Sequence, residues 1–392
     1  FETLFTGWEI LGICSFLLIG FYRDRYLPVR NSLKVISVYR LGDICLILAM
    51  WMSHHLWNQN ITFIKMNDSV AVASLVQDHY MYVVFIGVLI VVAAAVKSAQ
   101  LPFSSWLPRA MEGPTTSSAI FYGSLSVHMG VFLLLRTFSF WEHQYSVRVI
   151  IALLGIVTAI ISTLTARVQS SVKSQIAYAS IAQIGLIFIE ISLGFENLAL
   201  FHFAGNAFLR TYQLLVSPSV VSYLIREQFY NFIPRKHIAE NSLPKRIQYT
   251  IYMLSLKEWN LDWFMFKFVW MPIKNVGRKI NFLNFKTTVI VFSIILFGGL
   301  LALHYEYHIP YKIHRFLPEM FGLFGLLFVI KSFTERKNVF LSWTLVLMNN
   351  IMISLSISFN EHFAYTHTLL LSLIHISEPT RQAEISYAVF CL

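Results

Sequence analysis

The sequence predicts an all-α, polytopic bundle of membrane-spanning helices that contains at least one broken helix. Hydrophobic residues make up 56% of the 392 residues, whereas charged residues make up 13%, roughly half of the ~25% typical of soluble domains. The apolar residues gather in runs of about 20, the length that crosses a bilayer. Paired short segments with strand periodicity are absent from the sequence, which disfavours a β-barrel.

We expect ten membrane-spanning helices and an eleventh candidate near residue 365. Each stretch is mostly apolar over roughly the length of a spanning helix, although several contain polar residues. The ten stretches are 5–22, 35–52, 80–99, 117–136, 147–167, 175–193, 197–224, 287–304, 316–331 and 338–358.

The net charge of +10 lies in loops between the apolar runs, which favours a membrane face over a nucleic-acid partner. Basic loops alternate with weakly charged ones, so the positive-inside rule directs the first helix from outside to inside. The longest loop, 225–286, interleaves eleven basic and four acidic residues with aromatic side chains. This composition suits a helix in the plane of the membrane interface, and an ordinary cytoplasmic loop is the alternative.

These features divide the chain into four predicted regions. Residues 1–224 form a transmembrane core, 225–286 a basic amphipathic cytoplasmic insert, and 287–370 the C-terminal transmembrane helices. Residues 371–392 resemble the translation of a sequencing-library adapter, so we exclude them from functional reasoning. We interpret the start at Phe1, next to an apolar run, as a truncation.

The sequence offers no cofactor or metal motif. Its three cysteines, Cys14, Cys45 and Cys391, are too few for a disulfide framework and lack metal-site spacing. A glycine-rich nucleotide fingerprint, an iron–sulfur cysteine run and a zinc-ligand cluster are all missing. We therefore expect no bound cofactor and no redox site in the chain itself.

Ionisable residues inside the apolar runs are the candidate functional groups, because a charge at mid-bilayer costs about 2.5–3.5 kcal/mol on insertion scales. Glu9 lies in the first run, and Asp43 follows Arg40 by three residues in the second. The i,i+3 spacing lets Arg40 and Asp43 meet on one helix face. The alternatives are an interfacial carboxylate for Glu9 and a structural ion pair for Asp43.

Lys97 ends the apolar run 80–99 and is followed by Pro102, Pro108 and Pro114. Each proline lacks an amide hydrogen and disrupts a helix, so the sequence predicts a break directly after the lysine. Discontinuous helices of this kind form ion sites at the membrane midplane in transporters. The alternative is a lysine that extends to the membrane surface at a helix end.

Three polar residues, His202, Asn206 and Arg210, follow one another at i, i+4 and i+8 and therefore share one stripe of a helix. Such a stripe faces other helices or a cavity rather than lipid. His202 can change charge near neutral pH, whereas Arg210 stays protonated. The alternative is interhelical hydrogen bonding without a transport role.

Lys173 begins the helix that contains Ser180, Gln183 and Glu190. Alone, Lys173 would serve as a cytoplasmic anchor. Together with the buried charges above, these residues could form a lateral hydrophilic line along which hydration carries protons.

Several segments resemble the antiporter-like membrane subunits of respiratory complex I, of the chain 5 or subunit L type. The superfamily also includes Mrp-type sodium/proton antiporter subunits and the DabB-type partner of inorganic-carbon accumulation complexes. The resemblance spans residues 5–222. It is carried by GWEILGICSFLLIGFY, VYRLGD, KSAQLPFSSWLPRAMEGPTTSSA and GVFLLLR, and more weakly by SSVKSQIAYASIAQIG and ALFHFAGNAFLR.

The resemblance implies inverted helical repeats and a role for each candidate residue. Glu9 and Lys97 match the charge-coupled pair whose proton affinity changes during transport, and Asp43 matches the neighbouring acid. Lys173 matches a central-axis lysine, and His202 matches a conducting histidine.

This chain departs from the family pattern at several positions. Asn206 replaces a second histidine, Arg210 a lysine, Ser171 an acid and Tyr122 a histidine. After residue 222, the sequence offers no second lysine beside a helix break. Only Asn349 and Asn350 are polar positions in the interiors of the later helices. The first half therefore fits proton handling better than the second.

We expect a proton-translocating membrane subunit that works with other membrane subunits of a complex, in a bacterial cytoplasmic membrane. One alternative is a DabB-type subunit for bicarbonate or CO₂ uptake, which would need a soluble zinc-containing partner. Another is a membrane anchor that keeps the fold without conducting.

Overall fold

A computed structural model describes residues 1–57, 62–230, 244–280, 284–305, 310–335 and 338–360. Every regular element within these ranges is helical, which confirms the all-α prediction. The eleventh candidate span near residue 365 and the adapter-like segment 371–392 lie outside the described residues.

Nine helical segments in the described part of the chain are long and apolar enough to cross a membrane. They confirm a polytopic membrane protein. Their bounds are α1 Glu2–Ile19, α2 Tyr26–Trp57, α4 Ser69–Lys97 (apolar from Val72), the interrupted run Thr115–Arg136, α9 Tyr145–Val168, α10 Val172–Leu193, α15 Phe285–His304, α16 Tyr311–Thr334 (apolar from Phe316) and α17 Val339–Asn360 (apolar to Phe359).

The remaining predicted span, 197–224, forms the longer helix α11 Glu196–Tyr230, which is not among these nine segments. Polar side chains of the 202–210 stripe interrupt its apolar surface and lower its mean hydropathy. The helix is thus as long as predicted and more polar than the other spans.

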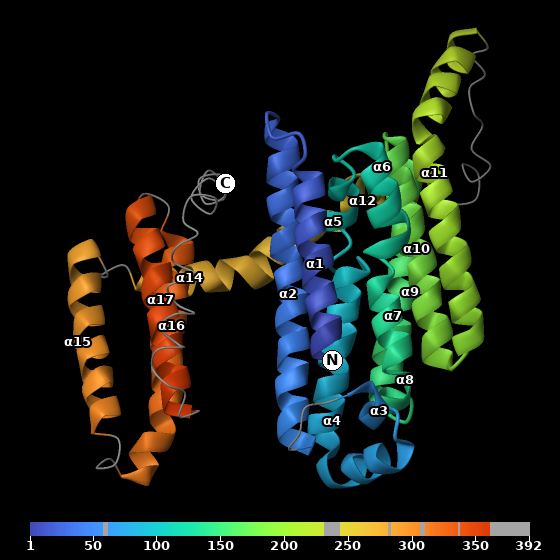
Figure 1. The fold of residues 1–392 in the computed structure, drawn as a ribbon. Coiled ribbons are helices and arrows are strands. Elements are labelled where there is room, and N and C mark those ends of the chain that lie inside the picture. The colour runs from blue at the N-terminus through green and yellow to red at the C-terminus, as the bar shows by residue number, and fades with distance from the viewer. Residues whose placement is uncertain (58–61, 231–243, 281–283, 306–309, 336–337, 361–392) are drawn as a thin grey trace. The chain divides into compact units, whose positions relative to one another are not determined.

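The chain divides into two compact units, one from Phe1 to Asp262 and the other from Trp263 onward. The membrane-spanning helices of the first unit run roughly parallel (Figure 1). Within it, α9 and α10 approach closely at Gly155 and Gly185. A Cβ at Gly155 would lie 2.5 Å from the Gly185 carbonyl oxygen, and one at Gly185 would lie 2.8 Å from that of Gly155. Small residues permit this close helix contact, as in other membrane bundles.

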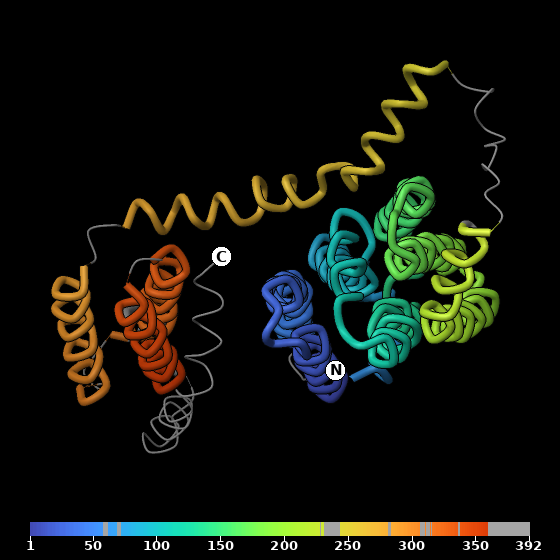
Figure 2. The backbone as a smooth tube through the Cα atoms, turned by 90° about the horizontal axis from the view of Figure 1, so that it is seen from above, coloured from blue at the N-terminus to red at the C-terminus, as the bar shows by residue number. Residues whose placement is uncertain are grey.

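The 225–286 segment is helical where it is described, and the boundary between the two units falls inside it. In the first unit, α12 Lys245–Leu256 packs against α9. Figure 2 views the first unit's bundle end-on, whereas α12 runs in the plane of that view. A helix that crosses the bundle axis has the orientation expected in a membrane interface.

The second unit joins α15, α16 and α17 around buried Phe321, Phe328, Leu345 and Met352. A short helix, α14 Met271–Lys279, packs on α16 and runs across its axis (Figure 1). Gly277 permits this contact, because a Cβ there would lie 2.4 Å from the Thr334 side chain.

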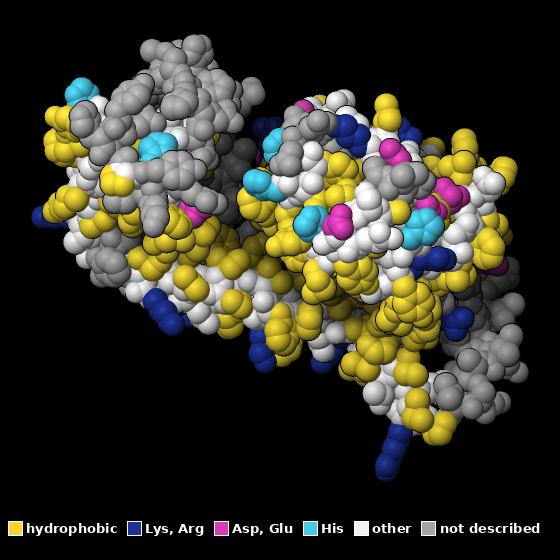
Figure 3. Space-filling view, turned by 90° about the horizontal axis from the view of Figure 1, so that it is seen from below, with side chains coloured by type: hydrophobic (Ala, Val, Ile, Leu, Met, Phe, Trp, Pro, Cys, Tyr) yellow, Lys and Arg dark blue, Asp and Glu magenta, His cyan; other side chains and the backbone are white. Residues whose placement is uncertain are grey.

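Large apolar side chains are exposed along the outer faces of α1, α2, α9 and α11, among them Ile13, Ile47, Ile160 and Phe208. Figure 3 shows hydrophobic side chains covering much of the described surface on one face of the molecule. A soluble protein rarely exposes so large a contiguous apolar surface, whereas a lipid-facing bundle requires it.

Candidate functional site

The helix break predicted after Lys97 is confirmed. Helix α4 ends at Lys97, Ala99 takes a left-handed conformation with φ of 52°, and a short helix, α5 Trp106–Ala110, follows. A second interruption separates the π-helix η1 Ala119–Leu125 from α7 Met129–Arg136.

Side chains form hydrogen bonds with backbone carbonyl groups at both interruptions. The Trp106 indole donates to the Val96 carbonyl oxygen (2.9 Å), and the Ser98 hydroxyl donates to the Val127 carbonyl oxygen (2.7 Å). The second contact joins the break after Lys97 to the interruption before α7. Unpaired backbone groups are costly away from water, so these bonds make both breaks tolerable inside the bundle.

Four charged residues gather beside the first break, and we call Glu9, Arg40, Asp43 and Lys97 the charge cluster. The Arg40 guanidinium donates to both carboxylate oxygens of Glu9 (2.6 and 3.1 Å), and its Nε lies 3.3 Å from Asp43 Oδ2. The predicted Arg40–Asp43 contact is therefore confirmed. Asp43 also accepts a hydrogen bond from the Trp8 indole (2.9 Å) and is buried.

Lys97 is buried, with 1% of its surface exposed, so its side chain does not extend to the membrane surface. Its ammonium donates to the Trp8 carbonyl oxygen (3.1 Å) and lies 4.9 Å and 4.2 Å from the ring centroids of Trp8 and Tyr39. Gly12 completes the enclosure, because a Cβ there would lie 3.5 Å from the lysine nitrogen. Aromatic faces and a carbonyl thus solvate the cation where water is scarce.

The expected Glu9–Lys97 pair takes a different form, because these residues make no direct ion pair. The guanidinium fork of Arg40 occupies both oxygens of Glu9, while Lys97 binds the carbonyl of the preceding residue, Trp8. Arg40 thus joins Glu9 to Asp43, and Trp8 joins Asp43 to Lys97, because its indole donates to Asp43 and its carbonyl oxygen accepts from the lysine.

A row of hydroxyl groups leads from this cluster toward the second interruption. The Tyr39 hydroxyl lies 3.1 Å from Ser126 Oγ, and the Ser15 hydroxyl lies 2.6 Å from the Tyr122 hydroxyl. Ser15 Oγ also lies 3.5 Å from the Tyr39 hydroxyl. Tyr122, which stands where the resemblance implies a histidine, thus belongs to a buried hydroxyl network.

A second polar assembly, which we call the polar chain, joins α10, α11 and the interruption before α7. His202 lies between Glu190, whose Oε1 is 2.8 Å from Nδ1, and Gln183, whose Oε1 is 2.9 Å from Nε2. Both ring nitrogens of His202 thus have an oxygen acceptor within hydrogen-bond distance. Glu190 and Gln183 are polar residues of α10, the helix that Lys173 begins, and we expected them to belong to a lateral hydrophilic line.

The rest of the polar chain confirms that the stripe faces other helices. Asn206 Nδ2 lies 3.1 Å from His128 Nε2, and Asn206 Oδ1 accepts from Arg210 Nε (3.1 Å). Arg210 also donates to Gln213 Oε1 (2.7 Å) and to the Ala179 carbonyl oxygen (3.3 Å). Both Asn206 and Arg210 are buried.

Sequence reasoning missed His128, which is 1% exposed and lies directly before α7. A histidine inside the run FYGSLSVHMGVFLLLR was the available signal. His128 follows Val127, whose carbonyl binds Ser98, so the residue sits next to the contact between the two breaks.

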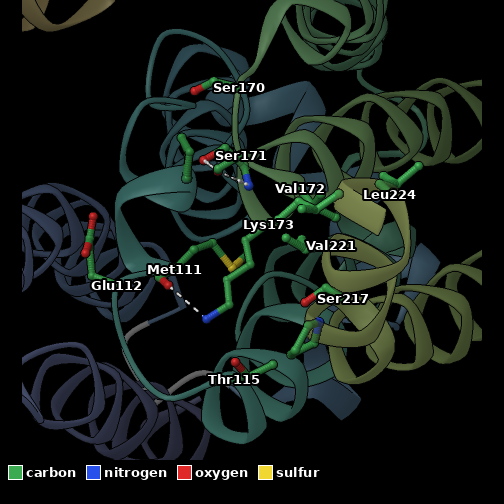
Figure 4. A pocket seen from close by; sticks show the side chains of 14 residues that line it. Met111, Glu112, Thr115, Ser170, Ser171, Val172, Lys173, Ser217, Val221 and Leu224 are labelled. Carbon is green, nitrogen blue, oxygen red and sulfur yellow. Dashed lines mark hydrogen bonds between the residues drawn. The ribbon is translucent and has the colours of Figure 1, made fainter. Parts of the chain in front are cut away.

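Lys173 lies apart from both assemblies, in the first turn of α10. Its ammonium is 3.4 Å from the carbonyl oxygens of Met111 and Gly113, and it borders a pocket of about 820 Å³. Figure 4 shows its side chain crossing that pocket. No hydrogen bond or ion pair within the described residues connects Lys173 to the charge cluster or the polar chain.

The second unit also contains a buried lysine that sequence reasoning missed. Lys331 near the end of α16 is 2% exposed and lies 3.0 Å from Glu335. Asn349 and Asn350, the expected polar pair, lie on α17 and contact each other at 3.4 Å. Within the described ranges, no group of three or more His, Cys, Asp or Glu residues has a metal-binding arrangement.

Comparison with known proteins agrees with this architecture. The family profile described as NADH:quinone oxidoreductase/Mrp antiporter, transmembrane, matches residues 2–236. NADH-ubiquinone oxidoreductase chain 5 from Aspergillus niger is 34% identical over 218 residues, which cover 56% of this chain and 32% of that protein. The same-named protein from Canis lupus is 34% identical over 228 residues, covering 57% of this chain and 36% of that one.

Among solved structures, a chain of the Mrp complex from Dietzia sp. DQ12-45-1b superposes with a TM-score of 0.50 at 20% identity. The match covers 91% of this chain and 33% of that chain, and it supports the fold alone. The present chain spans about a third of the length of the relatives described here. With more than half of its residues matched by the family profile, the chain belongs to the transmembrane family of NADH:quinone oxidoreductase and Mrp antiporter subunits.

Proposed function

We propose that the chain is a proton-translocating, multi-pass membrane subunit whose first unit carries the proton-handling groups. The observation that supports this most directly is Lys97, an ammonium buried at a helix break with two acids and an arginine close by. Ionisable residues inside a membrane are costly, and when they gather at a broken helix they commonly belong to an ion path.

The charge cluster offers a way to couple proton binding to a charge rearrangement. Arg40 is shared between Glu9 and Asp43. A proton that neutralised either carboxylate would weaken that acid's hold on the guanidinium, which would then bind the other acid more fully. The electric field at Lys97 would change at the same time. The proton affinity of the Lys97 amine would therefore depend on which acid Arg40 binds.

The polar chain would carry protons onward through His202, with His128 as a second titratable group. Both histidines have hydrogen-bond partners from other helices. Arg210 cannot relay a proton because it remains charged, and we assign it the role of setting the local potential. The contact between Ser98 and the Val127 carbonyl brings the neighbours of Lys97 and His128 together, which makes this the natural crossing point.

Lys173 would act at the end of the path rather than along its centre, since it lies in the first turn of α10. The proposal gives the redox chemistry to another subunit, and we expect other membrane subunits as partners. The relatives and the solved structure described above give no support to the inorganic-carbon alternative. Its zinc-containing partner, like the bacterial location, stays a prediction, and the relatives come from eukaryotes.

Proton flux after neutralisation of single residues tests the proposal. The full chain and its complex would be placed in vesicles, and flux would be followed with an internal pH-sensitive dye. We expect Lys97→Met and Glu9→Gln each to reduce flux strongly, whereas Lys257→Met, at an exposed position outside both assemblies, leaves it unchanged. Unchanged flux in both cluster variants would favour a membrane anchor that does not conduct.

A further inference from the structure

A turn with an unusual backbone follows α12 in the first unit. Glu258, Trp259 and Asn260 have φ values of 50°, 56° and 54°, in the left-handed region that residues with a Cβ rarely adopt. Three such residues in succession are unfavourable unless surrounding contacts fix them in place. The contacts of this turn therefore have to compensate for its backbone conformation.

Ion pairs supply such contacts, and we call Lys34, Arg109, Glu258 and Asp262 the ionic clamp. Arg109 Nη1 lies 2.8 Å from Glu258 Oε2, and Arg109 Nη2 lies 2.7 Å from Asp262 Oδ2. Lys34 Nζ, on α2, lies 2.6 Å from the other carboxylate oxygen, Asp262 Oδ1. The chain that follows α12 is thus bound to α2 and to α5, while α12 itself packs against α9.

Arg109 is the central member of the ionic clamp, because it binds three oxygen acceptors. Besides the two acids, its Nη1 donates to the carbonyl oxygen of Ser105 (2.6 Å), the residue that precedes α5. The planar guanidinium presents its N–H groups in fixed directions, so it can bind several acceptors with defined geometry. The side chains of Arg109 and Glu258 are 26% and 19% exposed, so water screens their contact less than it screens a surface ion pair.

The same short helix, α5, also contributes to the surroundings of Lys97. Trp106 is fully buried, and its indole donates to the carbonyl oxygen of Val96, the residue before Lys97. The Trp106 ring meets the Tyr39 ring edge-on with 4.9 Å between centroids, and the Tyr39 ring faces the Lys97 ammonium at 4.2 Å. A displacement of α5 would therefore disturb both the helix break and the aromatic ring beside the lysine.

We propose that Arg109 is a positioning residue for the Lys97 site. Through the ionic clamp it fixes α5, and α5 in turn places Trp106 against Tyr39 and against the break. This inference rests on the proposed function, because it assigns the chain after α12 a part in setting the geometry of the proton-handling groups. Arg109 itself stays protonated and exchanges no proton.

Amide hydrogen exchange, measured on the full chain in lipid vesicles, tests whether the clamp holds α5. We expect Arg109→Gln to speed the exchange of amides within residues 98–111 about tenfold and to leave α17 unchanged. Unchanged exchange within 98–111 would overturn the proposal. This measurement does not depend on proton transport, so it separates failure of the clamp from failure of the proposed function, which unchanged flux in Lys97→Met would show.

Proton flux tests whether the held position serves the Lys97 site. Arg109→Gln should lower flux about tenfold, because a displaced group is costly to a reaction that needs defined geometry. The double variant Glu258→Gln/Asp262→Asn removes the same contacts without altering α5 and should lower flux by a similar factor. Adding Arg109→Gln to that double variant should lower flux no further, since all three residues act as one unit.

Two further variants of arginines complete the flux measurement. Arg109→Lys keeps the charge and can bind one acid at a time, so it should recover part of the flux lost in Arg109→Gln. Arg167→Gln, which changes an exposed arginine near the end of α9, is the matched control and should leave flux unchanged. Faster exchange in Arg109→Gln without a loss of flux would overturn the positioning role.

A chemical crosslink separates the position of α5 from the charge of Arg109. In a background of Cys14→Ser, Cys45→Ser and Cys391→Ser, the pair Arg109→Cys and Asp262→Cys removes the ionic contact. A reversible bis-thiosulfonate reagent then restores a connection without the charges. We expect the crosslinked protein to recover most of the lost flux and to lose it again on reduction. Flux that stays low after crosslinking would show that the charge is what matters and would overturn the proposal.

Discussion

The charge cluster and the polar chain lie in the same unit, but different interactions stabilise their buried polar groups. The charge cluster holds two acids and two bases, and only Arg40 contacts more than one of the other members directly. The polar chain links neutral amides, histidines and one arginine through successive hydrogen bonds. The first assembly is therefore balanced by charge, and the second mainly by hydrogen bonding.

This difference indicates where proton affinity can change. In the charge cluster, moving one cation or adding one proton alters the field at every other member, because charges interact strongly where the dielectric constant is low. In the polar chain, Arg210 keeps its charge and the amides cannot titrate, so change is confined to the histidines and Glu190. Under the proposed function, the charge cluster is the switch and the polar chain is a conductor of limited capacity.

The largest expected effect comes from removing the lysine of the charge cluster. Lys97→Met should lower proton flux by about a hundredfold, the scale associated with losing a group that transfers protons. Lys173→Met should lower it by less than about threefold, since Lys173 contacts neither assembly. Flux measured in vesicles with a pH-sensitive dye would show this, and equal losses would argue against a special role for the charge cluster.

A smaller loss is expected in the polar chain. His202→Gln keeps hydrogen-bonding capacity toward Gln183 and Glu190 but removes the titratable ring, so flux should fall by about tenfold. His143→Gln, at an exposed position, provides the control. If both variants conducted equally well, the polar chain would be a structural network only.

A gain is expected where the polar chain departs from the family pattern. Arg210→Lys introduces a group that can release its proton, so flux should rise by about threefold in the same vesicle assay. Arg148→Lys, which changes a half-buried arginine bonded to the Ser192 carbonyl, should leave flux unchanged. A fall in Arg210→Lys would show that the guanidinium contacts matter more than the missing titration.

The smallest effect concerns the ionic contacts of Asp262, a residue outside the membrane-spanning helices whose carboxylate is partly exposed to solvent. Arg109 lies 2.8 Å from Glu258 and 2.7 Å from Asp262, and Lys34 lies 2.6 Å from Asp262. Burial alone would raise the pKa of Asp262, but the nearby Lys34 and Arg109 hold it below its ordinary value.

Because the pKa of Asp262 is lower in the folded state, its contacts stabilise the fold above the unfolded pKa and are lost as the pH falls below about 4. Thermal unfolding of the purified protein should therefore show less acid destabilisation in Asp262→Asn than in the native sequence. The difference should be about 1 kcal/mol or less, because the carboxylate is partly exposed. Identical acid sensitivity in both proteins would exclude a contribution from Asp262.

Local spacing predicted part of the candidate site correctly. The i,i+3 pair Arg40–Asp43, the break after Lys97 and the polar stripe on α11 all follow from periodicity or from proline chemistry within a few residues. The partner of Glu9 did not follow, because Arg40 lies 31 residues away on another helix. The contact of His128 with Asn206 could not be predicted either, because a single histidine in an apolar run does not indicate which helix it will face.

The sequence by itself determined that this chain is a helical membrane protein. Backbone polar groups in lipid must find hydrogen-bond partners within the protein, which a helix provides, and the lengths of the apolar runs can be counted directly in the sequence. It also determined which residues are too polar to face lipid. The tertiary structure decided how those residues combine: the aromatic enclosure of Lys97, the sharing of Arg40 between two acids, and the isolation of Lys173 beside its own pocket. These outcomes depend on the rotation and depth of each helix against its neighbours, which hydropathy does not specify.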